Sequence, residues 1–327
     1  MSPRLTFETC GHFAIVQSRS SVGLGREWST LVAHTREWDV TMLVFPMRST
    51  TAVDGVMVAT RSVEGELRSR IDALGNVGHR PAGAFDVSRL PGTARILVIP
   101  EGTRVSARIR NRYYDRLPDV AIVGPSSRPV ALQIDGKAPV EIPLSPLDWS
   151  RLTPVVAATV ADRILGAADL GITCLDDVAD TNKGDLAGRT IARLADAVVA
   201  RGIAPLDGTT VALIAQLTAL IDAGDVDDAA TAADHLSTSP HNLRRIALRW
   251  FGFPPKTLLM RRRFIAALER FQEAGMDFAT ITNFGYFDAS HFLRDANRFL
   301  GTTPRRYLRR IDASAHGKSA SDRPDYR

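Results

Sequence analysis

A repeat of 49 residues near the C-terminal end constrains the fold more than any other feature of the sequence. Shifting the chain by 49 positions superimposes identical residues, among them the pairs Asp228 and Asp277, Ala230 and Ala279, Arg245 and Arg294, Ala247 and Ala296, Arg249 and Arg298, Gly252 and Gly301, and Pro255 and Pro304. Ser239 falls on Asp288, and both residue types are favoured as helix N-caps. Each copy predicts a short helix, a tight turn, a longer helix and a glycine stop, which is the pattern of a helix-turn-helix unit.

The segment between the two copies is expected to form a rigid helix. From Lys256 to Glu273, apolar residues recur at helical spacing: Leu259, Phe264, Ala267, Leu268 and Phe271. One connecting helix would hold the two units at a fixed separation.

Four stretches in this region resemble the AraC/XylS family of transcriptional regulators. Residues 284–294 (FGYFDASHFLR) and 298–307 (RFLGTTPRRY) are similar to the signature of that family's second unit, and residues 236–245 (LSTSPHNLRR) to its first unit. Residues 252–259 (GFPPKTLL), with Arg263, resemble the start of the family's linker helix. The resemblance implies a domain that binds double-stranded promoter DNA through two helix-turn-helix units.

The resemblance extends over about residues 225–310, with departures at the first turn and in both longer helices. Ser237 and Thr238 stand where the family favours glycine and an apolar residue, and Ala247 and Ala296 replace a usual phenylalanine. These departures concern the packing of each recognition helix rather than the fold.

The surplus positive charge of the chain lies in the same region. Residues 226–311 hold 14 Lys and Arg against 8 Asp and Glu, whereas residues 1–225 hold 24 against 25. A basic module beside a neutral one indicates a polyanionic partner for that module alone. A solvated helical face is the alternative that charge counts leave open.

Helical spacing separates buried positions from DNA-facing positions in each recognition helix. The inward set comprises Leu243, Ile246 and Trp250 in the first unit and Phe292, Ala296 and Phe299 in the second. The outward set, predicted to contact bases, comprises His241, Arg244 and Arg245 in the first unit and Ser290, Leu293, Arg294 and Asn297 in the second. Arginine reads guanine with two hydrogen bonds, whereas leucine can only touch apolar groups such as the thymine methyl. A phosphate contact or a solvated charge is the alternative for each arginine.

Four further residues flank the starts or ends of helices and are predicted to contact phosphates: Ser239, Arg249, Thr303 and Arg306. Such contacts position the protein on the duplex without reading its sequence.

The first part of the chain predicts a β-sandwich or barrel. From Leu5 to about Ile142, short β-branched and aromatic runs alternate with turn residues; the clearest runs are 12–16, 39–45, 94–99, 104–110 and 130–134. By the same family resemblance, this part is expected to be a cupin-like sensor domain.

Helical periodicity follows the β-rich part. Residues 148–170, 185–200 and 209–223 predict amphipathic helices, and residues 176–184 predict a loop. We therefore expect a β-rich sensor domain at 1–147, a helical linker at 148–223, a DNA-binding domain at 224–311 and a disordered tail at 312–327. The linker stretches 186–199 and 211–221 are candidate dimer surfaces, although packing within one chain explains their apolar stripes about as well.

Signals for catalysis, metals and membranes are weak. His12, His34 and His79 have no neighbouring ligands at metal-binding spacing, so neither metal nor cofactor is expected. Trp28, Trp38, Phe45, Tyr113 and Tyr114 could line a ligand pocket, but aromatic residues of a β domain are more often core. Cys10 and Cys174 are too few for a disulfide framework. No apolar run approaches the roughly 20 residues of a membrane span, and no secretion signal is recognisable.

These observations favour a cytoplasmic, non-enzymatic regulator that binds specific promoter DNA in successive major grooves. An unknown small-molecule effector, RNA polymerase and a second copy of the chain are its further expected partners. One alternative is a cupin-type enzyme fused to a DNA-binding tail, which the lack of a metal constellation disfavours. Another is a nonspecific architectural DNA binder, which would discriminate poorly between sequences.

Overall fold

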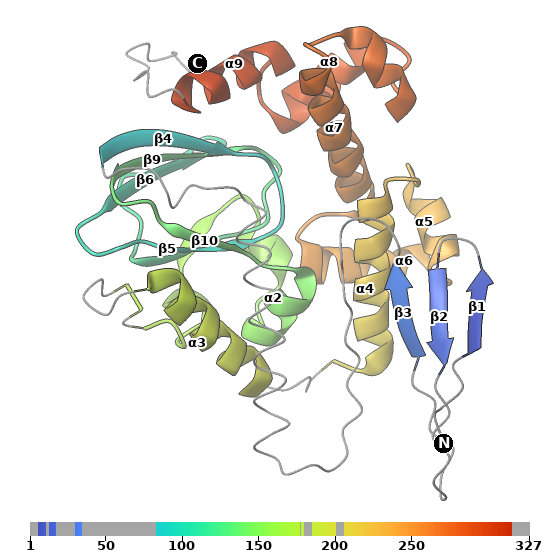
Figure 1. The fold of residues 1–327 in the computed structure, drawn as a ribbon, viewed down its shortest axis with the longest axis horizontal. Helices are drawn as coiled ribbons and strands as arrows, with labels where there is room; N and C mark the ends of the chain where they lie inside the picture. The colour runs from blue at the N-terminus through green and yellow to red at the C-terminus, as the bar shows by residue number, and fades with distance from the viewer. Residues whose placement is uncertain are drawn as a thin grey trace, which may run out of the picture. The chain divides into compact units, whose positions relative to one another are not determined.

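The computed structural model describes residues 6–10, 13–17, 30–34, 83–176, 178–179, 185–200 and 206–315. The chain divides into two compact units, residues 1–56 and 57–327. In the first unit, three antiparallel strands pair in the order β1 (Thr6–Cys10), β2 (Phe13–Gln17) and β3 (Thr30–His34) (Figure 1). Strand β2 confirms the run predicted at 12–16, whereas the run predicted at 39–45 lies outside the described residues.

The described part of the second unit begins at residue 83 with two four-stranded antiparallel sheets that lie in separate layers (Figure 1). One sheet has the order β4 (Gly83–Arg89), β9 (Val130–Gly136), β6 (Arg104–Ile109) and β7 (Arg112–Tyr114). The other has the order β10 (Val140–Pro143), β5 (Arg95–Val98), β8 (Val120–Val123) and β11 (Ile164–Gly166). The predicted β-rich domain is thus confirmed, while nothing in these strands establishes the cupin-like designation.

Strand β5 is buried on both faces, which fixes the order of layers. Leu97 packs with residues of the other sheet, among them Val105 and Leu132, whereas Ile96 and Val98 point into a second core. Successive side chains of a strand point to opposite faces, so one strand serves two cores. The second core contains residues of the helices that follow.

The helix predicted over 148–170 is wrong beyond its first turns. The structure has helix α2 (Pro146–Leu152), then the 3₁₀ turns η2 (Ala157–Val160) and η3 (Ala168–Leu170) on either side of strand β11. The residue before a proline is disfavoured in helical conformation, and Thr153, which precedes Pro154, is extended at φ −149° and ψ 144°. The apolar residues beyond this point fill the core from turns and from a strand paired with β8.

Two predicted helices are confirmed as α3 (Leu186–Ala200) and α4 (Gly208–Ala223). Their apolar stripes pack into the second core of the same chain: Ile191, Leu194 and Val198 from α3, and Leu213, Ile214 and Leu217 from α4. Within the described chain, internal packing therefore accounts for these stripes. None of the described helices is both long and apolar enough to cross a membrane.

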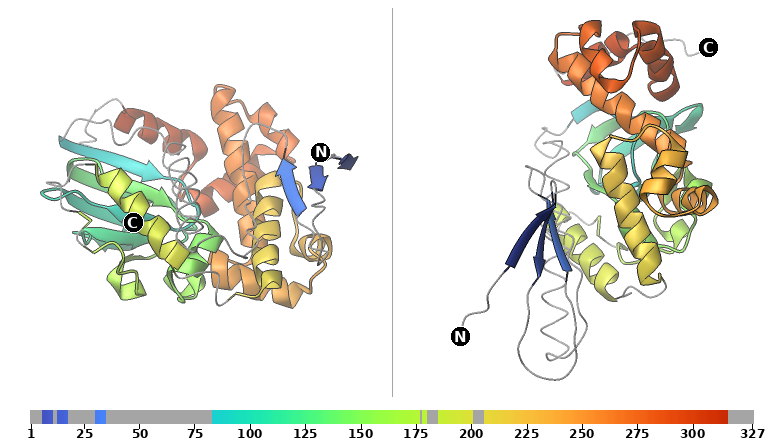
Figure 2. Two further views of the ribbon diagram at one scale, coloured as in Figure 1. Left: turned by 60° about the horizontal axis from the view of Figure 1, so that its bottom comes forward. Right: turned by 90° about the vertical axis from the view of Figure 1, so that its right-hand side faces the viewer.

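The C-terminal part is helical, and α7 runs through it from one unit of the repeat to the other (Figures 1 and 2). Its elements are α5 (Ala229–His235), α6 (Pro240–Ile246), the π-helical turn η5 (Ala247–Phe251), α7 (Pro255–Glu273), the 3₁₀ helix η6 (Phe278–Phe284), α8 (Ala289–Phe299) and α9 (Pro304–Ala315). Helix α9 continues past Ile311, so residues 312–315 of the predicted disordered tail are helical; the remainder lies outside the described residues.

Candidate nucleic-acid interface

The repeat seen in the sequence is also a repeat of hydrogen bonds. Asp228 caps α5 by accepting from the backbone N–H of Ala230 at 2.9 Å, and Asp277 caps η6 by accepting from that of Ala279 at 2.9 Å. Capping side chains satisfy N–H groups that the first turn of a helix leaves without partners. The paired aspartates therefore start the first helix of each unit in the same way.

The recognition helices also begin alike. The hydroxyl of Ser239 accepts from the backbone N–H of Asn242 at 3.1 Å, and a carboxylate oxygen of Asp288 accepts from that of His291 at 2.8 Å. These caps place the first turns of α6 and α8 at matching positions of the repeat, as the sequence predicted.

Both recognition helices end at a glycine in the left-handed region, Gly252 at φ +83° and Gly301 at φ +73°. A side chain is disfavoured there. At Gly252 it would also meet Pro125, whose atoms lie 2.8 Å from the position of a Cβ. Pro255 and Pro304 then open α7 and α9, so the repeat extends into the following helix.

The inward and outward positions of both recognition helices are confirmed. The predicted inward residues are all buried: Leu243, Ile246, Trp250, Phe292, Ala296 and Phe299. The predicted outward residues are exposed, except for Leu293, which is half-buried: His241, Arg244, Arg245, Ser290, Arg294 and Asn297. Each recognition helix therefore presents polar and basic side chains to solvent along one side.

Arg245 is held in place by a neighbour that the sequence analysis missed. Its guanidinium donates to Asn242 Oδ1 from Nη2 at 2.8 Å and from Nε at 3.3 Å. Asn242 in turn donates to the hydroxyl of Thr238 at 2.9 Å. Residues three apart share a helix face, so the spacing of Asn242 and Arg245 was a usable signal. Thr238, polar where the related family is apolar, takes part in this chain of contacts.

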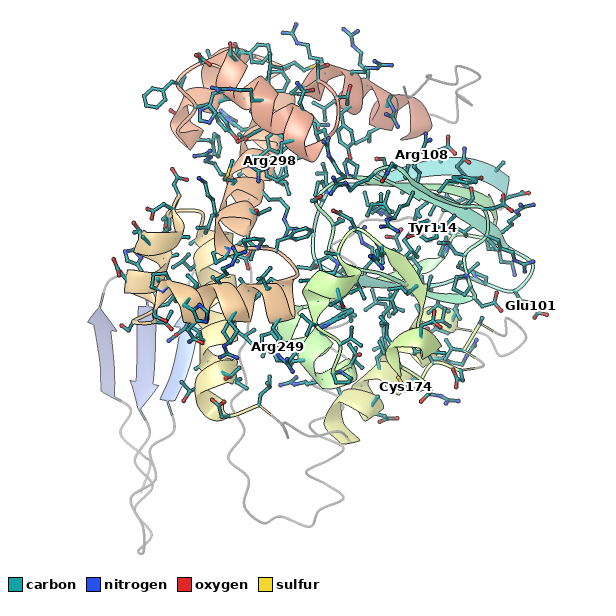
Figure 3. All side chains as sticks on the ribbon, turned by 180° about the vertical axis from the view of Figure 1, so that it is seen from behind. Glu101, Arg108, Tyr114, Cys174, Arg249 and Arg298 are labelled. Atoms are coloured by element: carbon teal, nitrogen blue, oxygen red, sulfur yellow. The ribbon has the colours of Figure 1, made fainter. Side chains whose placement is uncertain are left out.

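The four candidate phosphate contacts lie on the surface at helix ends. Ser239, Arg249, Thr303 and Arg306 are exposed, and Thr303 accepts from the backbone N–H of Arg306 at 3.4 Å. Arg249 lies over the ring of Trp250 at 4.7 Å (Figure 3).

The partner of Arg249 in the repeat makes the same kind of contact. Arg298 lies over the ring of Phe299 at 5.5 Å (Figure 3) and also donates to the sulfur of Met260 at 3.7 Å. In both units, an aromatic ring thus supports the guanidinium near the end of the recognition helix.

A buried polar cluster links the two helix-turn-helix units through α7. Arg263 of α7 pairs with Asp227, just before the first unit, at 3.4 Å and with Asp295 of α8 at 3.6 Å. The hydroxyl of Tyr286 donates to the same Asp295 oxygen at 2.9 Å, and the guanidinium lies over the Tyr286 ring at 5.1 Å. Burial, followed by the charge of Asp295, raises the pKa of Tyr286.

No role for this cluster was predicted from the sequence. Asp295 lies on the buried side of α8, where a carboxylate is rare unless it is paired. That anomaly was visible in the sequence; the identity of its partners on distant segments was not.

Helix α7 is also anchored to the β-rich part. The guanidinium of Arg261 donates to the backbone oxygen of Ser126 at 3.0 Å and to that of Gly92 at 3.2 Å. Burial lowers the pKa of Arg261 to about 10. Arg128, between β8 and β9, donates to the backbone oxygen of Asn297 in α8.

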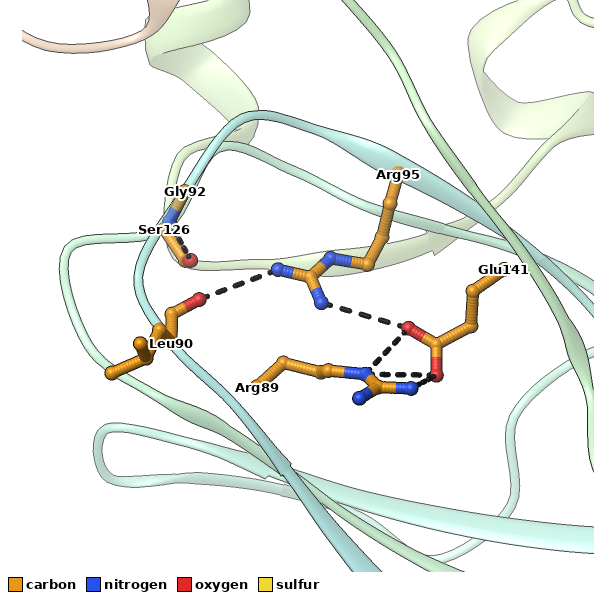
Figure 4. Close-up of polar contacts among 6 residues, drawn as sticks. All are labelled: Arg89, Leu90, Gly92, Arg95, Ser126 and Glu141. Carbon is orange, nitrogen blue, oxygen red and sulfur yellow. Dashed lines mark hydrogen bonds and ion pairs between the residues drawn. The ribbon is translucent and has the colours of Figure 1, made fainter. Parts of the chain in front are cut away.

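A second arginine cluster braces the strands beside this anchor (Figure 4). Glu141 accepts from Nη2 of Arg89 at 2.8 Å and pairs with Arg95 at 3.6 Å. Gly92 donates its N–H to the hydroxyl of Ser126 at 3.1 Å, so the loops that hold Arg261 are bonded to each other. Burial lowers the pKa of Arg95.

Few of the other candidate residues fall within the described part of the chain. No group of three or more His, Cys, Asp or Glu side chains that could hold a metal lies within the part of the chain that the structure describes. Tyr113 is 59% exposed, so it is not a core residue, and the hydroxyl of Tyr114 accepts from the N–H of Ile164 at 3.1 Å. Trp28, Trp38, Phe45, His12 and His79 lie outside the described residues, as does the side chain of His34.

Comparisons with known proteins bear on the C-terminal region. Residues 232–310 match the model of a helix-turn-helix domain family. None of the curated proteins matches the sequence. Among solved structures, ToxT from Vibrio cholerae in a P21 crystal form is 11% identical, with a TM-score of 0.38, over 69% of this chain and 96% of that chain. Wild-type ToxT bound to an unsaturated fatty acid is also 11% identical, with a TM-score of 0.37, over 69% of this chain and 93% of that chain.

These likenesses to solved structures are distant. The C-terminal domain is therefore assigned from the match to the helix-turn-helix family. Its boundaries enclose both capped recognition helices, α7 and the glycine stops. The C-terminal part of this chain is a helix-turn-helix domain of the AraC type.

Proposed function

We propose that the chain is a transcriptional regulator that binds specific promoter DNA through α6 and α8. One observation carries the proposal: two equivalently capped recognition helices, each with an exposed polar and basic side, flank one continuous helix that is bonded to both units. Two linked recognition helices are useful for reading two stretches of one duplex.

The length of α7 fits such a duplex. At 19 residues, α7 spans roughly 28 Å, given a rise of about 1.5 Å per residue. One turn of DNA, the distance between successive major grooves on one face, is about 34 Å. A connector of this length supports binding of both helices to one face of the duplex, about 10 base pairs apart.

The proposal assigns different roles to exposed residues of the two units. Base contacts are assigned to the outward faces: His241, Arg244, Arg245, Ser290, Leu293, Arg294 and Asn297. Phosphate contacts are assigned to the helix ends: Ser239, Arg249, Thr303 and Arg306. The basic character of the region supports both, because phosphate contacts supply affinity and base contacts supply selectivity.

Control by a small molecule is part of the proposal. The β-rich part contacts the DNA-binding part at several places, among them Arg261 at the loops of Gly92 and Ser126 and Arg128 near the end of α8. A ligand that shifts these loops would act on both recognition helices. A thermal-shift screen of small molecules tests this, because a ligand selective for the native state raises its stability. RNA polymerase and a second copy of the chain are the proposed protein partners.

Selection of binding sites from a pool of random-sequence duplexes tests the proposal directly. The full-length chain should enrich two short motifs spaced by about one helical turn, and footprinting should protect both on one face. Enrichment of a single motif, with one protected half-turn per protomer, would contradict the role of two recognition helices. Binding without enrichment of any sequence would instead favour the nonspecific architectural alternative.

A further inference from the structure

Phe287, in the turn of the second helix-turn-helix unit, is exposed without a folding reason. Its side chain is 96% exposed. Among the described residues, the only other large hydrophobic side chain with marked exposure is Tyr113, on strand β7. A single exposed apolar side chain is common on protein surfaces, but this one stands in the turn that leads into a recognition helix with an exposed basic side.

A residue at the position of Phe287 often packs against the first turns of the following helix, but here Tyr286 makes that contact. Phe287 directly precedes the N-cap Asp288, and an apolar residue there often packs against the fourth helical residue, which is Phe292. Phe292 is instead fully buried against the ring of Tyr286, at 5.3 Å between ring centroids. Within the described part of the chain, the ring of Phe287 therefore takes no part in packing.

Phe287 lies next to the N-terminal end of α8, the helix proposed to face DNA. It stands in the turn one residue before Asp288, the extended N-cap of α8, and the exposed side of the helix that follows carries Ser290 and Arg294. A recognition helix presents its N-terminal end to the bases of the major groove. In that arrangement, the ring of Phe287 lies at the leading end of the contact surface.

The chemistry of the ring limits what it can recognise. Phenylalanine has no hydrogen-bonding group, and the apolar feature of the major groove is the 5-methyl group of thymine. We propose that Phe287 is a specificity-determining residue that selects thymine at one position of the second half-site by packing against this methyl group. This inference rests on the proposed DNA-binding function and adds a residue that the polar spacing of α8 did not reveal.

The test compares thymine with deoxyuridine, which lacks only the methyl group. Sites selected by the full-length protein from random-sequence duplexes are resynthesised with deoxyuridine at each thymine in turn. One substitution in the second half-site should weaken binding of the unchanged protein about fourfold, which corresponds to about 0.8 kcal/mol for burial of one methyl-sized group. Phe287→Ala should lose about the same factor on the thymine duplex and show no further loss with deoxyuridine.

Two variants serve as controls. Tyr113→Ala removes an exposed aromatic ring from the β-rich part and should keep the full sensitivity to deoxyuridine. Leu293→Ala removes the other apolar side chain of this face and should leave the loss at the Phe287 position unchanged. The melting temperature of Phe287→Ala should equal that of the unchanged protein, because the ring is exposed.

The outcomes separate this inference from the proposed function. If Phe287→Ala retains the loss caused by deoxyuridine at every position, or leaves DNA affinity unchanged while lowering transcription with RNA polymerase, the thymine assignment is wrong. In the latter case the ring belongs to a protein contact. If the unchanged protein enriches no sequence at all, the proposed function itself fails, and this inference fails with it.

Discussion

The two helix-turn-helix units repeat one local design within two different cores. Leu243, Ile246 and Trp250 of the first unit share a core with Ile96 of β5 and Trp149 of α2. The second unit instead has an aromatic core drawn from α7, η6, α8 and α9, with Leu90 as the contribution from the β-rich part. Matching caps and glycines thus begin and end two recognition helices that differ in form, α6 with the π-helical turn η5 and the uninterrupted α8, while the surroundings decide how far a disturbance spreads.

Because the cores differ, the two recognition helices are held in place by different parts of the chain. The first unit is continuous with the β-rich part, so its recognition helix is held by the same residues that build that part. The second is held through α7, the buried Arg263 cluster and a few contacts of Arg128 and α9. Changes in the β-rich part should therefore reach the first recognition helix through its shared core, and the second through α7 and the contacts of Arg128 and α9.

The largest expected effect comes from removing one buried side chain in each unit. Phe292→Ala should cost about 3–5 kcal/mol and Leu243→Ala about 2–5 kcal/mol of unfolding free energy, since both leave cavities. Hydrogen exchange should show lost protection confined to the second unit for Phe292→Ala, but spread to β5 and α2 for Leu243→Ala. If protection is lost over equally wide regions in both variants, the two units do not have separate cores.

The next effect concerns the tie between the units. Asp295→Asn should cost about 1.5–3 kcal/mol, because Asp295 is buried, forms an ion pair with Arg263 at 3.6 Å and accepts a hydrogen bond from Tyr286. Asp227→Asn, at the exposed end of the same cluster, should cost under about 1 kcal/mol. On DNA, Asp295→Asn should tolerate an extra base pair between the half-sites better than the unchanged protein. If both variants keep the same spacing preference, the cluster does not set the distance between units.

Two matched variants test the proposed base contacts of the two recognition helices by their affinity for DNA. Arg245→Ala and Arg294→Ala should each cost about 1–3 kcal/mol and relax preference at one base position, in the first and second half-site respectively. Arg306→Ala should instead weaken binding equally on all sequences and reduce the salt slope by about one, because it removes a phosphate contact. Titrations on single-base variants at two salt concentrations distinguish these results. A uniform loss for Arg294→Ala would contradict its role as a reader.

Alkaline pH should affect the second unit more than the first, which contains no tyrosine between Asp228 and Gly252. Because the pKa of Tyr286 is raised by burial, this tyrosine stays neutral in the folded chain at pH values where the unfolded chain ionises. Its contribution to stability is complete below pH of about 10 and declines above it. Tyr286→Phe should cost about 1 kcal/mol at neutral pH, through the lost hydrogen bond to Asp295, and should lessen the alkaline decline. An unchanged decline in unfolding experiments from pH 8 to about 11 would contradict this.

The sequence predicted the features that depend on neighbouring residues, but it did not predict contacts between distant segments. Caps at Asp228, Ser239, Asp277 and Asp288 act within three residues, so their types alone placed the helices. The error over 148–170 arose because periodicity cannot show that 164–166 pairs with β8. The partners of Asp295 lie on α7 and in the second turn, and such contacts require the fold.

The smallest expected effect concerns the turns. In both units a turn residue adopts a positive φ, but the residue types differ. Ser237 in the first turn has φ +48°, and Gly285 in the second has φ +70°; glycine adopts this left-handed region without the steric cost that a side chain brings.

Ser237→Gly should therefore stabilise the chain by about 0.5–1 kcal/mol, since relief of strain exceeds the added entropy of an unfolded glycine. Gly285→Ser should destabilise it by a similar amount. The Cβ added there would lie 3.7 Å from a carboxylate oxygen of Asp227, an ordinary contact, so backbone strain is the expected cause. Chemical denaturation of both variants measures the two changes. Changes of the same sign would show that the turns are not equivalent, and the likeness between the units would then end at their helices.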